Sequence, residues 1–157
     1  MKKIVLGLVC LFMMSASLFA DMTRSQLQQM YLTFFRNNGI NAAIDSDGDV
    51  GFEWKSERLS PLNLYIMVDE DDQQYFRIEM FSGYSLNTAQ ERRQALFAAS
   101  AATRDAFVAK LFVNSNGDNI GVRAGAFVVS PGDFEAVFFK LMEGIEQVII
   151  SFLYYMG

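Results

Sequence analysis

Histidine is absent from this chain and cysteine is nearly so, with Cys10 the single example among 157 residues. Without an imidazole, the chain lacks the commonest general base and the commonest ligand for transition metals. Cys10 lies in a segment that we expect to be removed, so the mature protein has no thiol for nucleophilic attack, metal binding or a disulfide. These absences favour a non-catalytic protein, and we expect neither a cofactor nor a bound metal.

Basic residues are also few. The chain holds 13 Lys and Arg against 18 Asp and Glu, and removal of Lys2 and Lys3 leaves 11 basic residues and a formal charge of −7. A surface of this sign repels both phosphate backbones and anionic lipid. We therefore expect no nucleic-acid partner.

The first 20 residues have the organisation of an export signal. Lys2 and Lys3 precede an apolar run from Ile4 to Met14, and a stretch of small residues then ends at Ala20. This order is typical of a signal peptide that is cleaved before the next residue, here Asp21. The sequence thus predicts a bacterial protein that works in the periplasm or is secreted.

Two other interpretations of the apolar start, a membrane anchor and a lipoprotein signal, fit less well. The uncharged run from Ile4 to Ala20 has 17 residues, fewer than the roughly 20 that span a bilayer. A lipoprotein signal needs a small residue before the modified cysteine, and Val9 precedes Cys10. We predict a cleaved signal peptide over residues 1–20 and a single mature domain over 21–157, with no stable membrane span.

Apolar residues recur with helical or strand periodicity along the first half of the mature chain. A capping box at Thr23 and Gln26 opens a segment with apolar residues at helical spacing, which Asn37-Asn38-Gly39 should end. Three later segments alternate apolar and polar residues as half-buried strands do; they are 50–55, 62–68 and 75–80. Their short connections predict antiparallel neighbours.

The second half begins with another capping box, at Thr88 and Glu91, which predicts a helix that runs to about Ala109. Small residues at 98–102 allow close approach to a neighbouring element, so we expect this helix to be centrally packed. The large residues expected to flank the packed centre are Leu96, Phe97, Phe107 and Val108. A hairpin around the turn at 116–118 and a final helix from Ser130-Pro131 to the end complete the chain.

The predicted elements follow the order α-β-β-β-α-β-β-α, with room for one more short strand before Asp45. This order gives an α+β fold with an antiparallel sheet and three helices. It resembles the YbjN-like family, whose fold is that of type III secretion chaperones. The resemblance extends over most of the mature chain, in the runs 44–54, 68–78, 91–92, 108–111 and 127–131.

The resemblance implies a tendency to dimerise and to bind polypeptides. Family members are often labelled sensory-transduction regulators, and the family brings no catalytic residues with it. Type III secretion chaperones act in the cytoplasm, so the signal peptide argues against the same role here.

Two acidic segments are the candidates for chemistry. The carboxylates at 45–49 stand at alternate positions and could converge on a hard cation, but their spacing does not match an EF-hand loop. Those at 69–72 could supply a proton donor and a base, as in glycosidases, although nothing in the sequence buries either. We expect solvated turns at both. A carboxylate-dependent hydrolase of the cell envelope remains the alternative function.

The last helix carries more apolar residues than one stripe can hold. One set recurs at core spacing: it comprises Phe134, Val137, Phe138, Leu141, Ile145, Val148, Ile149, Phe152 and Tyr155. A second set projects toward the opposite side, and it comprises Phe139, Ile150, Leu153 and Tyr154. Either the helix is enclosed between the sheet and another helix, or the second set contacts a second subunit or a client protein.

The function that we expect is therefore an exported protein-binding or regulatory module, homodimeric and without catalytic residues. Aromatic and Met side chains suit adaptable protein contacts. The expected partner surface is the outer side of the last helix, together with an open sheet face that carries Tyr65, Met67, Tyr75 and Phe127. The partner is a protein or peptide, including a second copy of the chain.

Overall fold

A computed structural model describes residues 22–69, 71, 75–128 and 131–157, so the predicted signal peptide and its cleavage point lie outside the described residues. The elements are α2 (Arg24–Asn37), β1 (Ala42–Ile44), β2 (Val50–Trp54), β3 (Leu62–Met67), β4 (Tyr75–Ser85), α3 (Ala89–Arg104), β5 (Ala109–Val113), β6 (Asn119–Phe127) and α4 (Pro131–Met156). The predicted α+β class is confirmed, and β1 is the additional short strand before Asp45.

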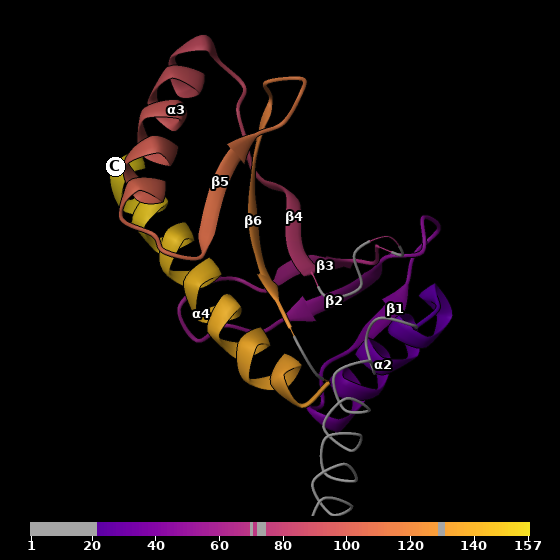
Figure 1. The fold of residues 1–157 in the computed structure, drawn as a ribbon. Helices are drawn as coiled ribbons and strands as arrows, with labels where there is room; N and C mark the ends of the chain where they lie inside the picture. The colour runs from indigo at the N-terminus through magenta and orange to yellow at the C-terminus, as the bar shows by residue number, and fades with distance from the viewer. Residues whose placement is uncertain (1–21, 70, 72–74, 129–130) are drawn as a thin grey trace, which may run out of the picture.

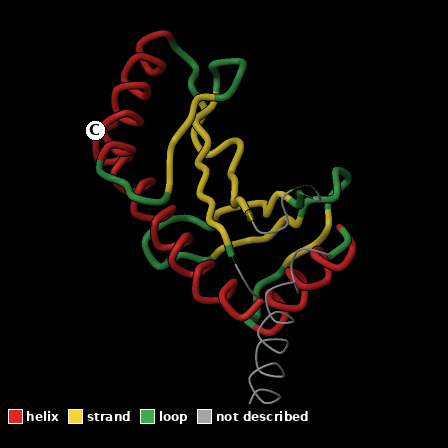
Figure 2. Tube along the Cα trace, viewed as in Figure 1, coloured by secondary structure: helices red, strands yellow, loops and turns green. Residues whose placement is uncertain are grey.

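The strands form one six-stranded antiparallel sheet in the order β1-β2-β3-β4-β6-β5. The sheet is strongly bent, because β2 and β3 run across the direction of β4, β5 and β6 (Figure 1). The helices lie along one side of this bend, with α4 passing beneath both halves of the sheet (Figure 2). Among the described residues, no helix combines the length and hydropathy needed to cross a membrane.

Both predicted capping boxes are present. The hydroxyl of Thr23 accepts a hydrogen bond from the amide of Gln26, and the side-chain oxygen of Gln26 accepts one from the amide of Thr23. Thr88 and Glu91 form the same pair of bonds. These bonds satisfy amides that the first turn of a helix otherwise leaves unpaired. Helix α2 ends at Asn37, and Gly39 follows with a φ of 68°. The predicted stop is therefore confirmed.

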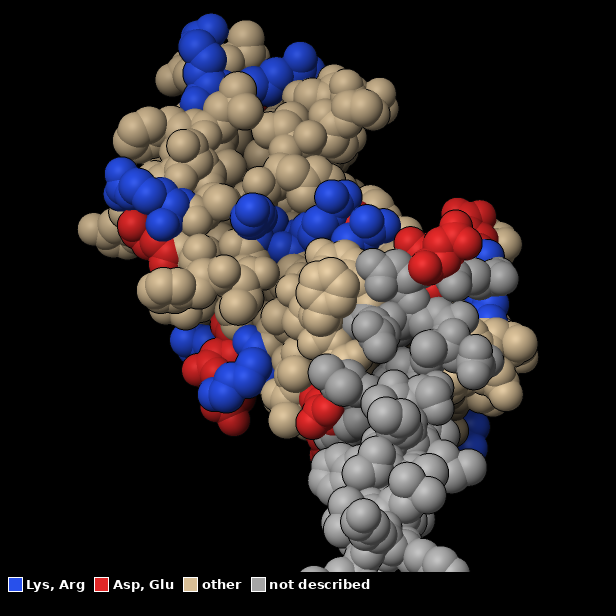
Figure 3. Space-filling view, in the orientation of Figure 1, with Lys and Arg blue, Asp and Glu red and all other residues tan. Residues whose placement is uncertain are grey.

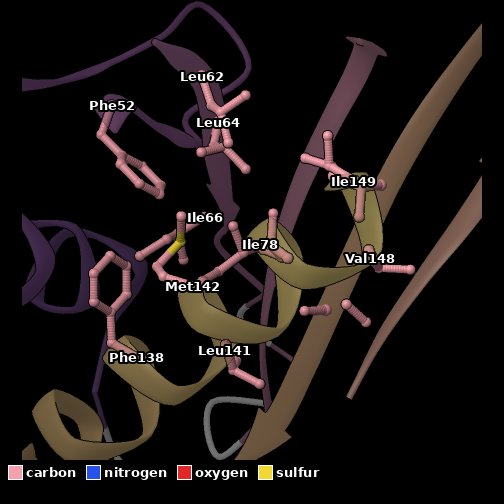
Figure 4. Close-up of a cluster of buried hydrophobic side chains, with 14 of the residues drawn as sticks. Phe52, Leu62, Leu64, Ile66, Ile78, Phe138, Leu141, Met142, Val148 and Ile149 are labelled. Atoms are coloured by element: carbon pink, nitrogen blue, oxygen red, sulfur yellow. The ribbon is translucent and has the colours of Figure 1, made fainter. Parts of the chain in front are cut away.

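The core lies between the inner face of the sheet and helix α4. Strand residues at alternate positions, among them Phe52, Leu64 and Ile78, are buried and face the fully buried Phe138 and Met142 of α4 (Figure 4). Phe35 of α2 stacks on Phe52 with a centroid distance of 4.6 Å. Alternation with a period of two therefore decides which face of each strand is covered.

The expected extent and surroundings of the second helix are wrong. Helix α3 ends at Arg104, and Ala109 already belongs to β5, where it pairs with Ala124 of β6. The hydroxyl of Thr103 accepts from the amide of Leu111 at 3.1 Å, so the chain reverses immediately after the helix.

The small residues of α3 do pack closely, but the large neighbours do not surround them. Ala95, Ala98 and Ala102 are buried. The large residues expected to flank this packed centre are exposed instead: Leu96, Phe97, Phe107 and Val108. Since the alanines form the inner face, Leu96 and Phe97 point away from it on a helix of 3.6 residues per turn.

Candidate functional site: the cleft between β3 and β4

The sheet divides between its third and fourth strands. Strand β3 pairs with β4 only over Tyr65–Met67, opposite Arg77–Glu79. The first half of β3, Leu62–Leu64, pairs with β2 on one side and has no register partner among the described residues on the other. Beyond Met80, β4 follows β6 and leaves β3. Two strand edges therefore diverge from a short paired segment.

Strand β4 bulges at the point of divergence. Its register with β6 shifts between Met80 and Tyr84, so the residues 81–83 oppose no residue in either neighbouring strand. Gly83 suits this bulge, because a Cβ there would lie 3.3 Å from the carbonyl oxygen of Ile120, a tight contact, and would displace the end of the Met80 side chain. A bulge of this kind bends a strand and leaves backbone groups unpaired.

A cavity of about 1060 Å³ occupies the space between the diverging strands. Its floor is formed by Ile149, Phe152 and Leu153 of α4. Leu62 and Leu64 of β3 line one wall, and Met80 and Tyr84 of β4 line the other. The cavity also reaches the open face of the sheet, where Tyr65, Met67 and Phe81 border it. We name this cavity the β3–β4 cleft.

A partly buried bridge joins the end of β2, next to the β3 wall of the cleft, to α4. Trp54, at the end of β2, donates its indole N–H to Glu146 Oε1 at 2.8 Å, and Arg58 Nη2 lies 3.0 Å from Glu146 Oε2. Burial disfavours the charged form of Glu146, but hydrogen bonds from Trp54, Arg58 and Ser56 outweigh it and lower the pKa of the carboxyl group. The loop between β2 and β3 is thereby fixed beside the cleft.

The mouth of the cleft is acidic, because the 45–49 turn and Glu53 contribute to its lining. The turn is confirmed, because Asp45 Oδ1 accepts from the amides of Asp47 and Asp49 at 2.9 Å each and Gly48 has a φ of 87°. The expected solvation is wrong for Asp49, which is buried. The carboxylate of Asp49 in turn accepts from the amide of Val68 at 2.9 Å. These oxygens serve backbone amides, as Asx turns do.

The second acidic segment is described only in part. Asp69 and Asp71 are exposed, and Asp69 Oδ1 accepts from the amide of Asp71 at 2.9 Å. Residues 70 and 72 lie outside the described residues. Within the described part of the chain, no group of three or more His, Cys, Asp and Glu could hold a metal ion.

The structure brings together only part of the predicted partner surface. Tyr65 and Met67 from the sheet and Leu153 from α4 all border the β3–β4 cleft. Tyr75 and Phe127 form a separate ring pair on the open sheet face, with centroids 5.0 Å apart.

The outer side of α4 comprises Phe139, Ile150 and Tyr154, which lie outside the cleft, whereas Leu153 is partly exposed at the border of the cleft. Phe139 is partly exposed beside the rings of Phe34 and Trp54, and Ile150 is half-buried. Tyr154 is 81% exposed and Leu153 43% exposed. Enclosure of this side within the chain, one of the two interpretations of the last helix, is therefore wrong for Phe139, Leu153 and Tyr154.

Phe81 and the bulge that begins there were not predicted from the sequence. The signal was present in the sequence, since the alternation of β4 breaks after Met80 and a glycine follows within three residues. A glycine inside a strand often marks a bulge or a close approach of another group. The separation of β3 from β4 has no such local signal.

Comparisons with known proteins give a fold but no family. No family model matches the chain, and no curated protein matches it. A crystal structure of an uncharacterized protein from Methanothermobacter thermautotrophicus is similar, with a TM-score of 0.53 and 11% identity over 83% of this chain and 99% of that one. At this identity the likeness concerns the fold alone, and the resemblance to the YbjN-like family stays a prediction.

Proposed function

We propose that the mature domain is an exported, non-catalytic module that holds an extended segment of another polypeptide in the β3–β4 cleft. The observation that carries this proposal is the divergence of β3 from β4, which leaves two strand edges with no register partner among the described residues, above an apolar floor. Unpaired edges accept an added strand through backbone hydrogen bonds, and pockets for alternate side chains then select the sequence.

The dimensions and lining of the cleft suit such a segment. Its volume of about 1060 Å³ is slightly above the range of typical ligand sites, roughly 300–1000 Å³. In an added strand, alternate side chains point to opposite faces. One set would contact Ile149 and Phe152 on the floor, and the other would lie beside Tyr65 and Phe81 on the open face.

The charge at the mouth narrows the class of partner. Asp47 and Glu53 are exposed at a cleft whose floor and two strand walls are lined mainly by apolar side chains. Complementary charge favours correct partners and repels acidic ones. The proposed ligand is therefore an apolar, strand-forming segment that carries Lys or Arg residues.

The outer side of α4 supports the homodimer that we also propose. Phe139 and Tyr154 leave apolar surface exposed outside the cleft. A two-fold contact would cover this surface with its own copy.

Polypeptide binding is better supported than the carboxylate-dependent hydrolase. An acid catalyst needs a desolvated carboxyl group that keeps its proton near neutral pH. Asp69 and Asp71 are exposed, and Asp45 is engaged by two amides of its own turn.

Adjacent residues of α4 provide a matched test of the cleft. Fluorescence anisotropy would measure the binding of labelled peptides that alternate Leu or Val with Lys or Thr. We expect Leu153→Glu to weaken binding by about tenfold or more, because it places a charge in the apolar floor. Tyr154→Glu, one residue further and outside the cleft, should leave the affinity unchanged.

Two results would contradict the proposal. Equal effects of the two substitutions would remove the cleft as the binding site. Unchanged affinity for peptides that are N-methylated at alternate amides would rule out strand pairing, because such peptides lack the amide hydrogens that the mode requires.

A further inference from the structure

The open face of the sheet contains a buried carboxylate between two arginines. Glu79 of β4 is 1% exposed, and its Oε1 lies 2.6 Å from Arg77 Nε and 2.6 Å from Arg123 Nε. Arg77 stands two positions earlier on the same strand, and Arg123 is the register partner of Glu79 on β6. All three side chains therefore lie on one face of the sheet.

One carboxylate oxygen cannot satisfy both guanidinium groups. Arg77 Nε and Glu79 Oε1 are buried and make no hydrogen bond of good geometry, so the contacts are close ion pairs. The side chains of Arg77 and Arg123 remain 36% and 49% exposed. Each guanidinium carries five N–H donors in a planar fork, so donors remain for a further acceptor.

Positive charge predominates on the β5 and β6 side of this cluster, where Lys110 of β5 is exposed and lies opposite Arg123. On the β3 side, Asp69 and Asp71 line a small pocket together with Arg77. The chain as a whole has a formal charge of −5. Lys and Arg side chains form a band across the middle of this face, over β4, β5 and β6 (Figure 3).

Aromatic rings border the arginines and fix their surroundings. Arg123 lies over the ring of Phe112, with its guanidinium carbon 5.3 Å from the ring centroid. The Tyr75–Phe127 ring pair lies at the end of the same two strands, where Arg77 faces Gly125. Aromatic neighbours restrict the guanidinium groups through cation–π contact and exclude water from one side.

We propose that Arg77 and Arg123 form a binding site for an oxyanion, a carboxylate or a phosphate group, on the open face of the sheet. Glu79 is a positioning residue in this site, because it holds both guanidinium groups at one point and leaves a positive excess. Bidentate recognition by paired arginines suits both carboxylate and phosphate. The site lies beside the β3–β4 cleft, because Tyr65 and Met67, which border the cleft, are the register partners of Glu79 and Arg77. Neither arginine lines the cleft.

Nuclear magnetic resonance of the arginine Nε–Hε groups tests the proposal directly. The full mature protein would be titrated at low salt with inorganic phosphate and, separately, with a capped tetraglutamate peptide. We expect the signals of Arg77 and Arg123 to shift together and to saturate, while that of Arg104, paired with Asp105 on the distant α3, stays in place. Tighter binding of phosphate than of the peptide would identify phosphate as the ligand group, and the reverse would identify a polypeptide carboxylate.

A variant with unchanged net charge distinguishes a specific oxyanion site from general attraction by positive charge. Arg77→Gln alone leaves Glu79 with one counter-charge and is open to misfolding. The pair Arg77→Gln with Glu79→Gln keeps the net charge and avoids the unpaired carboxylate. We expect it to weaken anion binding by about tenfold, whereas Arg104→Gln has no effect.

Three outcomes would overturn the proposal: shifts that do not saturate, equal shifts at Arg104, or unchanged affinity in the paired variant. Leu153→Glu should leave the anion affinity unchanged. Failure of the oxyanion site and failure of peptide binding in the cleft are therefore separate results.

Discussion

The indole N–H of Trp54 and the carboxylate of Glu146 lie 92 positions apart in the sequence and form a hydrogen bond of 2.8 Å. This bond joins the end of β2 to the middle of α4. The bond thereby fixes the β3 wall of the β3–β4 cleft relative to its floor. The floor begins at Ile149, in the next turn of α4. The shape of the cleft thus depends on a contact between its two sides.

The bond makes part of the stability of the domain dependent on pH. The pKa of Glu146 is lowered from the usual 4.5 in the folded protein, so its contribution is present at neutral pH and is lost as the pH falls below that value. We expect Glu146→Gln to lower the free energy of unfolding by about 1–3 kcal/mol at pH 7, as for hydrogen bonds to charged groups. Urea unfolding at pH 7 and at pH 3.5 would measure this difference, which should shrink in acid.

Glu143→Gln is the matched control on the same helix. Glu143 is mostly exposed and pairs with Lys140 at 3.2 Å, so its removal should cost well under about 1 kcal/mol. A penalty for Glu146→Gln that stays the same at both pH values would contradict the assigned role of the charged form.

Two phenylalanines, one buried in α4 and one exposed after α3, should differ strongly in how much their replacement by alanine lowers stability. Phe138 is fully buried among the rings of Phe34, Phe35 and Phe52. Phe138→Ala should cost about 3–5 kcal/mol of stability, because it leaves a cavity. Phe107 is fully exposed, and Phe107→Ala should change the stability by less than about 0.5 kcal/mol.

Denaturant unfolding of both variants would check these values. A large loss of stability for Phe107→Ala would show that Phe107 is covered, contrary to the structure of the single chain. Covering by a second copy would make that loss depend on protein concentration.

We predict a homodimer that forms through the outer side of α4 and that charged substitutions there disrupt. Replacing Phe139 and Ile150 by Glu should yield a folded monomer, since charge is costly in an apolar contact but tolerable on a surface. Circular dichroism would report folding, and light scattering would report mass. A wild-type monomer, or a variant that stays dimeric, would contradict this contact.

The 45–49 turn predicts that calcium has little effect on stability. Asp45 Oδ1 and Asp49 Oδ1 already accept from backbone amides, and the segment lacks the late bidentate carboxylate of an EF-hand. Thermal melts with millimolar calcium and with chelator should coincide. A clear upward shift of Tm with calcium would mean that the turn binds the ion, because a ligand of the native state raises stability.

Local patterns were sufficient to predict most elements of the fold. Alternation identified β2, and the capping boxes located the starts of α2 and α3, because these signals depend only on neighbouring residues. The end of α3 was not predictable in the same way. No glycine or proline follows within residues 105–109 to mark a stop, and the helix ends at Arg104 because Ala109 pairs with β6.

The candidate site was less predictable than the fold. Tyr65, Met67 and Leu153 were expected at partner surfaces on two separate elements, and only the tertiary structure places them around one cleft. Their meeting depends on the bulge at 81–83 and on the path of α4 beneath it. Glu79 carried no signal at all, because a single acidic residue in an alternating strand is ordinarily solvated.

Hydrogen exchange with a bound peptide would show whether the β3–β4 cleft accepts an added strand. Amide exchange would be measured by mass spectrometry with and without a saturating peptide that alternates Leu or Val with Lys or Thr. We expect protection to rise in two segments, 62–64 and 81–83, whose backbone groups have no register partner on the cleft side. Protection of the outer side of α4 alone, with exchange at both of these segments unchanged, would contradict strand addition in the cleft.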